Sequence, residues 1–276
     1  MSDSERNAQE AVGKSIQFKN GRYQVGMPWK EDPKTLPNNY KMAFSRLQTV
    51  ERQLQKDSGR RERYEEVIED CDKKGYVTKV NENAREKNGV WYLPHFCISK
   101  PEKETTKTRI VFDASSKFRD ISLNDCIHAG PKLQRDLVEI LLRFRKSPVA
   151  LACDVAEMYL QIELAPEDRP YHRFLWRGMD QTREPDVYQF NRLVFGVNSC
   201  PFQAQFVTQQ HALKNKTKLP RAAETVLLAT YMNDSLDSVA TESEAINLYQ
   251  QLSELWSSAG MHARKWLSNS ATVLAS

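Results

Sequence analysis

The sequence lacks the features that would place it among membrane proteins, secreted proteins or small zinc-binding domains. No apolar run approaches the roughly 20 residues that a transmembrane helix needs, and the polar N-terminus MSDSERNAQEAVGKS has no apolar core of a secretory signal. The 5 cysteines are far apart and form no C-x-x-C pair, which indicates neither a disulfide framework nor a zinc site. We therefore expect an intracellular globular protein without contact to a membrane.

A strong charge of either sign is also missing, since the net charge is +4 for 276 residues. The basic residues are nevertheless concentrated in three stretches: SKPEKETTKTR (99–109), LLRFRK (141–146) and HARKW (262–266). Each stretch alone fits an ordinary solvated surface. The three together favour a phosphate-bearing partner, because clustered Lys and Arg side chains attract phosphate groups.

The distribution of prolines and apolar residues divides the chain into three parts. Residues 1–36 carry few apolar residues and several prolines, which predicts a flexible N-terminal segment. Apolar residues recur at helical spacing over 38–54 and 64–71, and Gly75 supplies a stop, so residues 37–90 are expected to be mainly helical. The third part, 91–276, alternates strands with helices.

This third part predicts an α+β fold, because its strands include hairpins as well as strands separated by helices. Together with a strand at 75–80, the expected strands are 90–99, 108–115, 148–153, 187–190 and 192–195, and the expected helices are 134–146, 201–212 and 245–259. In the first of these helices four apolar residues are expected to face the core: Leu137, Ile140, Leu141 and Phe144.

The stretch LLATYMNDSLDSV (227–239) has the pattern of a β-hairpin with an acidic tip. Apolar residues run up to Tyr231, a polar Asn233-Asp234 step predicts the turn, and a second strand ends at Val239. Another strand, 149–153, ends at Asp154. If that strand pairs beside the hairpin, Asp154 and Asp234 converge, and two such carboxylates can bridge two divalent cations about 3.5–4 Å apart for phosphoryl displacement. Taken alone, an aspartate at a strand end is more often a turn former or a cap.

Four stretches, in this order, resemble motifs of the reverse transcriptase family: KTRIVFDAS, CDVAEMYLQI, LVFGVNSCPFQ and YMND. Four others, GRYQVGMPWKED, LPNN, SLNDCIHAGPKLQRDL and GMHARKWLSN, are similar to stretches of Pao/BEL-class LTR retrotransposons. The resemblance implies fingers and palm subdomains in 91–276, with an antiparallel palm sheet packed on helices and a pre-fingers region in 37–90. The thumb would be absent, and the domain truncated at its C-terminus. An unrelated α+β protein is disfavoured by so many motifs in order.

The resemblance also assigns roles to individual residues. It implies an RNA-directed DNA polymerase that uses two Mg2+ or Mn2+ ions, an RNA or DNA template with a primer, and deoxynucleoside triphosphates. The implied catalytic residues are Asp154, Asn233 and Asp234, and the implied metal site is Asp154, Val155 and Asp234. The implied nucleotide-binding residues are Lys107, Arg109, Tyr159, Phe195 and Gly196, with Tyr159 as the filter against a ribose 2′-hydroxyl, and the implied nucleic-acid contacts are Tyr231, Met232 and Lys265. Other polyprotein segments, namely protease, RNase H and integrase, are expected in an intact element and are absent here.

Asn233 departs from the family's Y-x-D-D box, where a carboxylate stands in its place. An amide oxygen can coordinate a hard cation but adds no charge, so metal affinity and transition-state stabilisation are expected to fall. Asp237 lies three residues from Asp234 and is not expected to replace the missing ligand. Two functions stay open on the sequence: a polymerase impaired by Asn233 and by truncation, and a catalytically dead nucleic-acid-binding remnant of the same fold.

Overall fold

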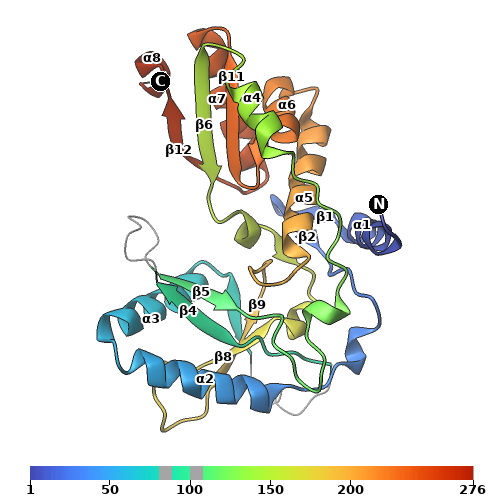
Figure 1. The fold of residues 1–276 in the computed structure, drawn as a ribbon, viewed down its shortest axis with the longest axis vertical. Helices are drawn as coiled ribbons and strands as arrows, with labels where there is room; N and C mark the ends of the chain where they lie inside the picture. The colour runs from blue at the N-terminus through green and yellow to red at the C-terminus, as the bar shows by residue number, and fades with distance from the viewer. Residues whose placement is uncertain (81–88, 100–107, 276) are drawn as a thin grey trace. The chain divides into compact units, whose positions relative to one another are not determined.

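The computed structural model describes residues 1–80, 89–99 and 108–275, and the chain forms two compact units (Figure 1). Each unit is assembled from segments that are far apart in the sequence. Unit 1 comprises Met1–Ser15, Val25–Gly130 and Glu163–Cys200, and unit 2 comprises Ile16–Gln24, Pro131–Ile162 and Pro201–Ser276. Within the described ranges, no helix combines the length and apolar character that a bilayer crossing requires.

Unit 1 contains the two helices that the apolar spacing predicted. Its helices are α1 (Asp3–Ser15), α2 (Tyr40–Leu54) and α3 (Ser58–Lys73), with single turns at Pro33–Thr35, Asn124–Cys126 and Arg169–Tyr171. Helix α3 is capped at its N-terminus by Asp57, whose side chain accepts a hydrogen bond from the Arg60 N–H at 2.9 Å. It ends before Gly75, which has a φ of +68° that glycine tolerates without strain.

The strands of unit 1 form small antiparallel ladders around an aromatic core. One sheet has the order β3 (Val77–Val80), β9 (Asp186–Phe190), β8 (Arg173–Trp176), and β4 (His95–Ser99) pairs with β5 (Thr108–Phe112); the two-residue β7 is Glu163–Leu164. Phe112, Phe174 and Phe190 are buried and lie with ring centroids 4.7–5.3 Å apart. Such aromatic contacts fix the two ladders against each other.

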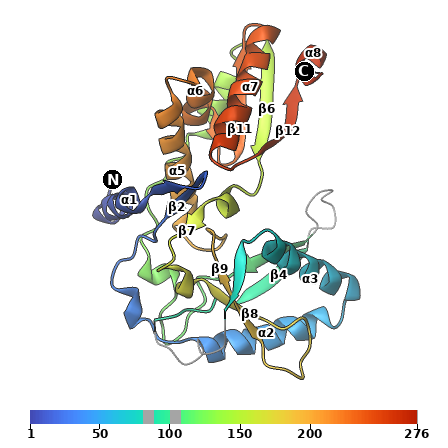
Figure 2. The ribbon, with the colours of Figure 1, turned by 180° about the vertical axis from the view of Figure 1, so that it is seen from behind.

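Unit 2 is built on a four-stranded antiparallel sheet (Figures 1 and 2). The strand order is β10 (Thr230–Tyr231), β11 (Asp234–Val239), β6 (Val149–Val155), β12 (Ala263–Ser268), and β1 (Gln17–Lys19) forms a hairpin with β2 (Arg22–Val25). The helices are α4 (Leu137–Phe144), α5 (Cys200–Asn215), α6 (Pro220–Leu228), α7 (Glu242–Ser258) and α8 (Ala271–Leu274), with a single turn at Met158–Gln161. Helix α7 packs against β6, β11 and β12. Burial alternates along β6, with Leu151, Cys153 and Val155 buried, so the second face of the sheet carries Asp154.

Three expected elements differ from the observed ones. Residues 1–36, expected to be a flexible segment, contain helix α1, whose Ala8 and Val12 are fully buried because they lie one turn apart on one face. Residues 192–195 form no strand; Leu193 and Val194 are buried in irregular backbone. Leu227 and Leu228 belong to helix α6 rather than to the hairpin, and Pro220 stands in the first helical turn, where its missing N–H costs nothing.

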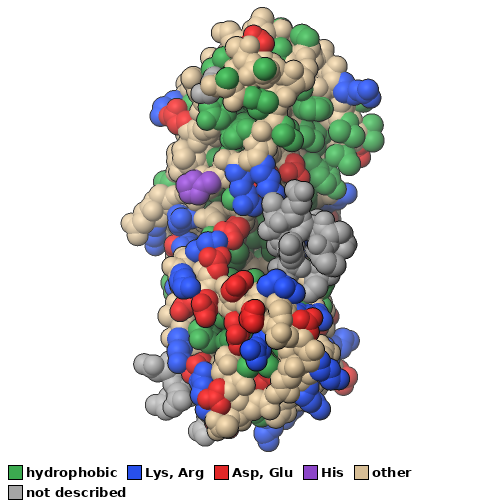
Figure 3. Space-filling model, turned by 90° about the vertical axis from the view of Figure 1, so that its left-hand side faces the viewer, with side chains coloured by type: hydrophobic (Ala, Val, Ile, Leu, Met, Phe, Trp, Pro, Cys, Tyr) green, Lys and Arg blue, Asp and Glu red, His purple; other side chains and the backbone are tan. Residues whose placement is uncertain are grey.

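The apolar face of α4 is another difference. Of the four residues expected to face the core, Ile140 is fully buried, whereas Leu137 and Leu141 are 42% and 43% exposed. Val138 and Leu142, on the remaining side, are more exposed still. Figure 3 shows hydrophobic side chains gathered over the upper part of the view, where the strands of unit 2 lie. Phe144 is half-buried, so Ile140 is the one residue of the predicted face that the core covers completely.

Candidate active site

The two predicted aspartates lie on neighbouring strands of the unit 2 sheet. Strands β6 and β11 are antiparallel, and Asp154 stands directly opposite Asp234 in the register. Directly paired residues project from the same face of a sheet. The predicted convergence of Asp154 and Asp234 is therefore confirmed by the strand pairing.

A third strand extends this arrangement. On its other edge β6 pairs with β12, and Arg264 stands directly opposite Asp154. Asp234, Asp154 and Arg264 thus form one row across β11, β6 and β12, which we call the charged row. Sequence reasoning had placed Arg264 in a basic cluster without a specific contact.

Both carboxylate oxygens of Asp154 are occupied by donors. Arg264 Nε donates to Oδ2 at 2.9 Å, and Asn233 Nδ2 donates to Oδ1 at 2.5 Å. An ionised carboxylate only accepts hydrogen bonds, so the amide must turn its nitrogen toward Asp154 and its oxygen away. Asn233 therefore acts as a donor to Asp154, whereas an aspartate at position 233 would be a second acceptor.

The backbone of Asn233 is also fixed to β6. The Val155 N–H donates to the Asn233 carbonyl oxygen at 2.8 Å. The hairpin turn consists of Met232 and Asn233, with Met232 at a φ of +57°, and Asp234 already pairs with Tyr231. The expected Asn233-Asp234 turn is thus wrong by one residue, because the αL position falls on Met232.

The electrostatics of the row raise the pKa of Asp234 above its usual value. Partial burial raises the pKa of Asp234, and the negative charge of Asp154 raises it further, while Lys265 opposes both effects. Two carboxylates held opposite each other repel, which is the second cause of the raised pKa of Asp234. A positive charge at the row relieves this repulsion, and Arg264 supplies one.

The donor set was tested against the two divalent cations that the family resemblance implies. Across the described part of the chain, no group of three or more His, Cys, Asp and Glu side chains is placed to hold a metal ion. Both oxygens of Asp154 already accept hydrogen bonds, from Asn233 and Arg264. Hard divalent cations need several free oxygen ligands with net negative charge. As arranged, these residues do not fit two cations, and the two-metal site stays a prediction.

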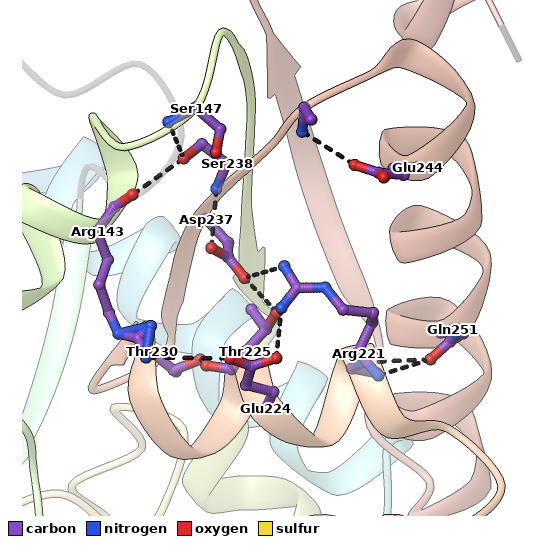
Figure 4. A network of polar contacts seen from close by, with 12 residues as sticks. Arg143, Ser147, Arg221, Glu224, Thr225, Thr230, Asp237, Ser238, Glu244 and Gln251 are labelled. Atoms are coloured by element: carbon purple, nitrogen blue, oxygen red, sulfur yellow. Dashed lines mark hydrogen bonds and ion pairs between the residues drawn. The ribbon is translucent and has the colours of Figure 1, made fainter.

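Asp237 lies on the other face of the sheet. It is three residues beyond Asp234, and an odd separation places the two side chains on opposite faces of a strand. Its Oδ2 accepts from Thr225 Oγ1 at 2.6 Å and from the Arg221 guanidinium at 3.1 Å, and its Oδ1 accepts from the Ser238 N–H at 2.8 Å (Figure 4). Asp237 therefore anchors α6 to β11 and is not available to the charged row.

The three predicted nucleic-acid contacts lie around the row. Tyr231 is in β10, and the carbonyl oxygen of Met232 accepts from Gln205 Nε2 on α5 at 2.9 Å. Lys265 is exposed at an irregularity of β12, with a φ of +53°. Gln205 was missed by sequence reasoning, since nothing in the local pattern of α5 marks a glutamine that supports a distant turn.

Tyr159 lies in the single turn Met158–Gln161 of unit 2, next to a partly buried polar contact. The Arg22 guanidinium donates to Gln161 Oε1 at 2.8 Å and to the Gly260 carbonyl at 3.0 Å, which fixes the turn Met158–Gln161. The Tyr159 ring is 3% exposed. A filter against a sugar hydroxyl needs ring surface open to the nucleotide, and its role in that filter stays a prediction.

The remaining predicted nucleotide-binding residues belong to unit 1. Arg109 is exposed in β5, Phe195 is 60% exposed, and Lys107 lies outside the described residues. Gly196 has a φ of +109°, and a Cβ there would overlap the carbonyl oxygen of Phe112. The glycine is therefore required by the close approach of the Phe112 backbone, where the sequence interpretation had invoked a base or a sugar.

Asn124 holds this glycine loop. Its Nδ2 donates to the Gly196 carbonyl at 3.1 Å, and its Oδ1 accepts from the Asn198 N–H at 2.9 Å. Asn198 returns a bond from its own Nδ2 to the Asn124 carbonyl at 3.1 Å. The exposed Phe195 thus lies directly before a loop segment whose backbone is held at Gly196 and Asn198.

Comparisons with known proteins define the class of fold. No family model matches the sequence, and no curated protein matches it. Among solved structures, a foamy viral protease-reverse transcriptase in complex with double-stranded DNA matches with a TM-score of 0.54 and 17% sequence identity, over 72% of this chain. The chain spans 30% of the length of that protein. At this identity the likeness concerns the fold, so the chain has a reverse-transcriptase-like fold.

Proposed function

We propose that the chain is the fingers and palm part of a Pao/BEL-class reverse transcriptase that binds a primer and template while its nucleotidyl transfer is impaired. Unit 1 would correspond to the fingers and unit 2 to the palm. The order of the motifs supports this assignment, and so does the likeness to a reverse transcriptase fold. The palm assignment is further supported by the antiparallel sheet that carries Asp154 and Asp234 on adjacent strands.

The observation that carries the proposal is the engagement of Asp154 by Asn233 and Arg264. A carboxylate whose two oxygens each accept a hydrogen bond, at 2.5 and 2.9 Å, must share or lose these donors before it binds a cation fully. Nucleic acid binding does not depend on that carboxylate, because it rests on Lys and Arg contacts to phosphates. The chain is therefore expected to bind a primer and template without adding nucleotides to the primer.

The partner proposed is a primer and template of RNA or DNA. The related fold was solved with double-stranded DNA, and this chain concentrates basic residues in three stretches. Contacts to phosphates make affinity fall linearly with the logarithm of the salt concentration. Binding by this chain is accordingly expected to weaken steeply as salt rises.

Fluorescence anisotropy with a labelled primer–template tests the binding half of the proposal. Titrations in EDTA and in Mg2+, each at several salt concentrations, are expected to give similar affinities that weaken with salt. Single-nucleotide primer extension on an RNA template tests the second half, and no extension is expected. A chain that fails to bind primer–template in low salt contradicts the proposed function outright.

A second candidate is an active RNA-directed DNA polymerase that takes deoxynucleoside triphosphates and two Mg2+ or Mn2+ ions. The direct opposition of Asp154 and Asp234 on one face of the sheet favours it. Extension of a primer by the unaltered chain would support this candidate over the first. The two candidates share the fold and the primer–template partner, so only turnover separates them.

A further inference from the structure

We infer that Arg264 is the resident cation of the charged row, and that it competes with divalent metal for Asp154. This inference rests on the proposed function in one respect: that Asp154 and Asp234 mark the place where a polymerase of this fold binds metal. It concerns metal affinity in the absence of nucleic acid, which is measured independently of primer–template binding. It makes Arg264, in addition to Asn233, a determinant of whether the site holds metal.

The placement of Arg264 is set by the backbone. Antiparallel pairing puts Arg264 of β12 directly opposite Asp154 of β6, next to Ala263 opposite Val155, and pairing resumes with Leu267 opposite Ala152. The register shifts between Arg264 and Leu267, which confines the irregularity to the segment after the arginine. Arg264 is therefore delivered to Asp154 by the sheet rather than by a mobile loop.

The chemistry of the pair suits a permanent counter-ion. A guanidinium stays protonated at any pH that the protein meets, and its planar donors match a carboxylate. The Asp154 side chain is 18% exposed, and that of Arg264 is 52% exposed. A pair in which one partner is mostly buried is screened less by salt than two fully exposed charges. The positive charge sits next to two opposed carboxylates, where it offsets part of their repulsion.

Asn233 completes the arrangement from the other side. Its amide nitrogen lies 2.5 Å from Asp154 Oδ1, so a cation approaching Asp154 meets a donor on each oxygen. An aspartate at position 233 would remove one donor and add one charge, yet it would leave Arg264 in place. The single substitution Asn233→Asp is therefore expected to raise the affinity for metal less than the same substitution combined with Arg264→Gln.

Titration with Mn2+ alone, followed by the electron paramagnetic resonance signal of the free ion, measures this directly. Four chains are compared: the unaltered chain, Asn233→Asp, Arg264→Gln and the double variant. Mn2+ affinity is expected to rise by about tenfold, or about 1.4 kcal/mol, when Arg264→Gln is added to Asn233→Asp. Equal affinity of the double variant and Asn233→Asp overturns the inference, as does failure of the double variant to bind Mn2+.

Further variants show whether a change in Mn2+ affinity comes from the charge at position 264, from the net charge of the chain or from a loss of the fold. Arg264→Lys keeps the positive charge and is expected to show no gain in Mn2+ affinity. Arg145→Gln removes an exposed arginine at the end of α4 and is likewise expected to leave Mn2+ affinity unchanged. Should Arg264→Gln lose its fold by circular dichroism, Arg264→Thr tests the same point, because threonine is favoured in strands. A gain shown equally by Arg145→Gln overturns the inference, since it would reflect net charge alone.

Discussion

Arg264 and Asp154 lie directly opposite each other on neighbouring antiparallel strands, with Nε of the arginine 2.9 Å from Oδ2 of the aspartate. The same aspartate stands opposite Asp234 on its other side. The face of the sheet that would present two acidic groups to a metal ion thus also carries an arginine, which pairs with one of them. The motif YMND and its partner strand indicate the fold. The contacts of Asp154 with Asn233 and Arg264 decide how easily the site could take up a metal ion.

The first prediction concerns Asp237, whose carboxylate has a structural role, in contrast to the carboxylate of Asp234 in the charged row. Asp237→Asn is expected to lower the free energy of unfolding by about 2 kcal/mol, since the bonds to Thr225 and Arg221 lose a charged acceptor. Urea unfolding measures the change. Mn2+ binding by the Asn233→Asp background is expected to be unaffected by it, whereas Asp234→Asn should abolish that binding. Reduced Mn2+ affinity in a stable Asp237→Asn chain would assign Asp237 to the metal site.

A second prediction concerns the buried ion pair of unit 1. Arg177 donates to both oxygens of Glu51 at 2.7 Å, and the side chains of Arg177 and Glu51 are 6% and 0% exposed. Glu51→Gln leaves the arginine buried without its counter-charge, which is expected to cost about 3–5 kcal/mol of stability. Glu62→Gln serves as a control, since it removes an exposed carboxylate on α3 of the same unit. Similar urea midpoints for the two variants would show that the pair contributes little.

The loop that carries Phe195 gives a third prediction. Gly196→Ala combines a strained φ of +109° with an overlap on the Phe112 carbonyl, so a loss of more than about 2 kcal/mol is expected. Gly178→Ala is the matched control, because Gly178 has a φ of +59° and no neighbouring atom within 4 Å of an added Cβ. Thermal unfolding should show a large shift for Gly196→Ala and a small one for Gly178→Ala. Equal shifts would mean that the Phe112 carbonyl moves away at little cost.

A fourth prediction concerns pH. Burial lowers the pKa of His95 to about 4 and that of His172 to about 4, from 6.5 in an exposed histidine. Below pH 6.5 the unfolded histidines bind protons that the folded ones do not, so stability falls as pH drops toward 4. A loss of about 2–4 kcal/mol is expected between pH 7 and pH 5. Urea unfolding at both values measures it.

The control for this prediction is His172→Phe, which cannot titrate at that position. About half of the histidine contribution to the pH dependence is expected to disappear in this variant. An unchanged difference between pH 7 and pH 5 would assign the pH dependence to other groups. The comparison uses differences within each chain, so a general loss of stability in the variant does not affect it.

The sequence predicted that Asp154 and Asp234 lie close together, because the strand pattern around each aspartate and the order of the motifs can both be read directly from the sequence. It could not predict the contact of Arg264, which depends on the register of β12 against β6 over about 110 residues of separation. Helix α6 was missed because a short apolar run such as LLAT fits a strand as well as a helix. Helix α1 and its burial were not predicted, because only two apolar residues, Ala8 and Val12, mark its buried face and their periodic signal is weak.

The most direct test of the account compares primer–template binding with single-nucleotide extension in the same preparation. The unaltered chain is measured beside Asn233→Asp and the double variant Asn233→Asp with Arg264→Gln, in Mg2+ and in Mn2+. The account predicts that all three bind primer–template in EDTA, that the unaltered chain adds no nucleotide, and that the double variant binds Mn2+ most tightly. Metal-dependent extension by the unaltered chain would contradict it.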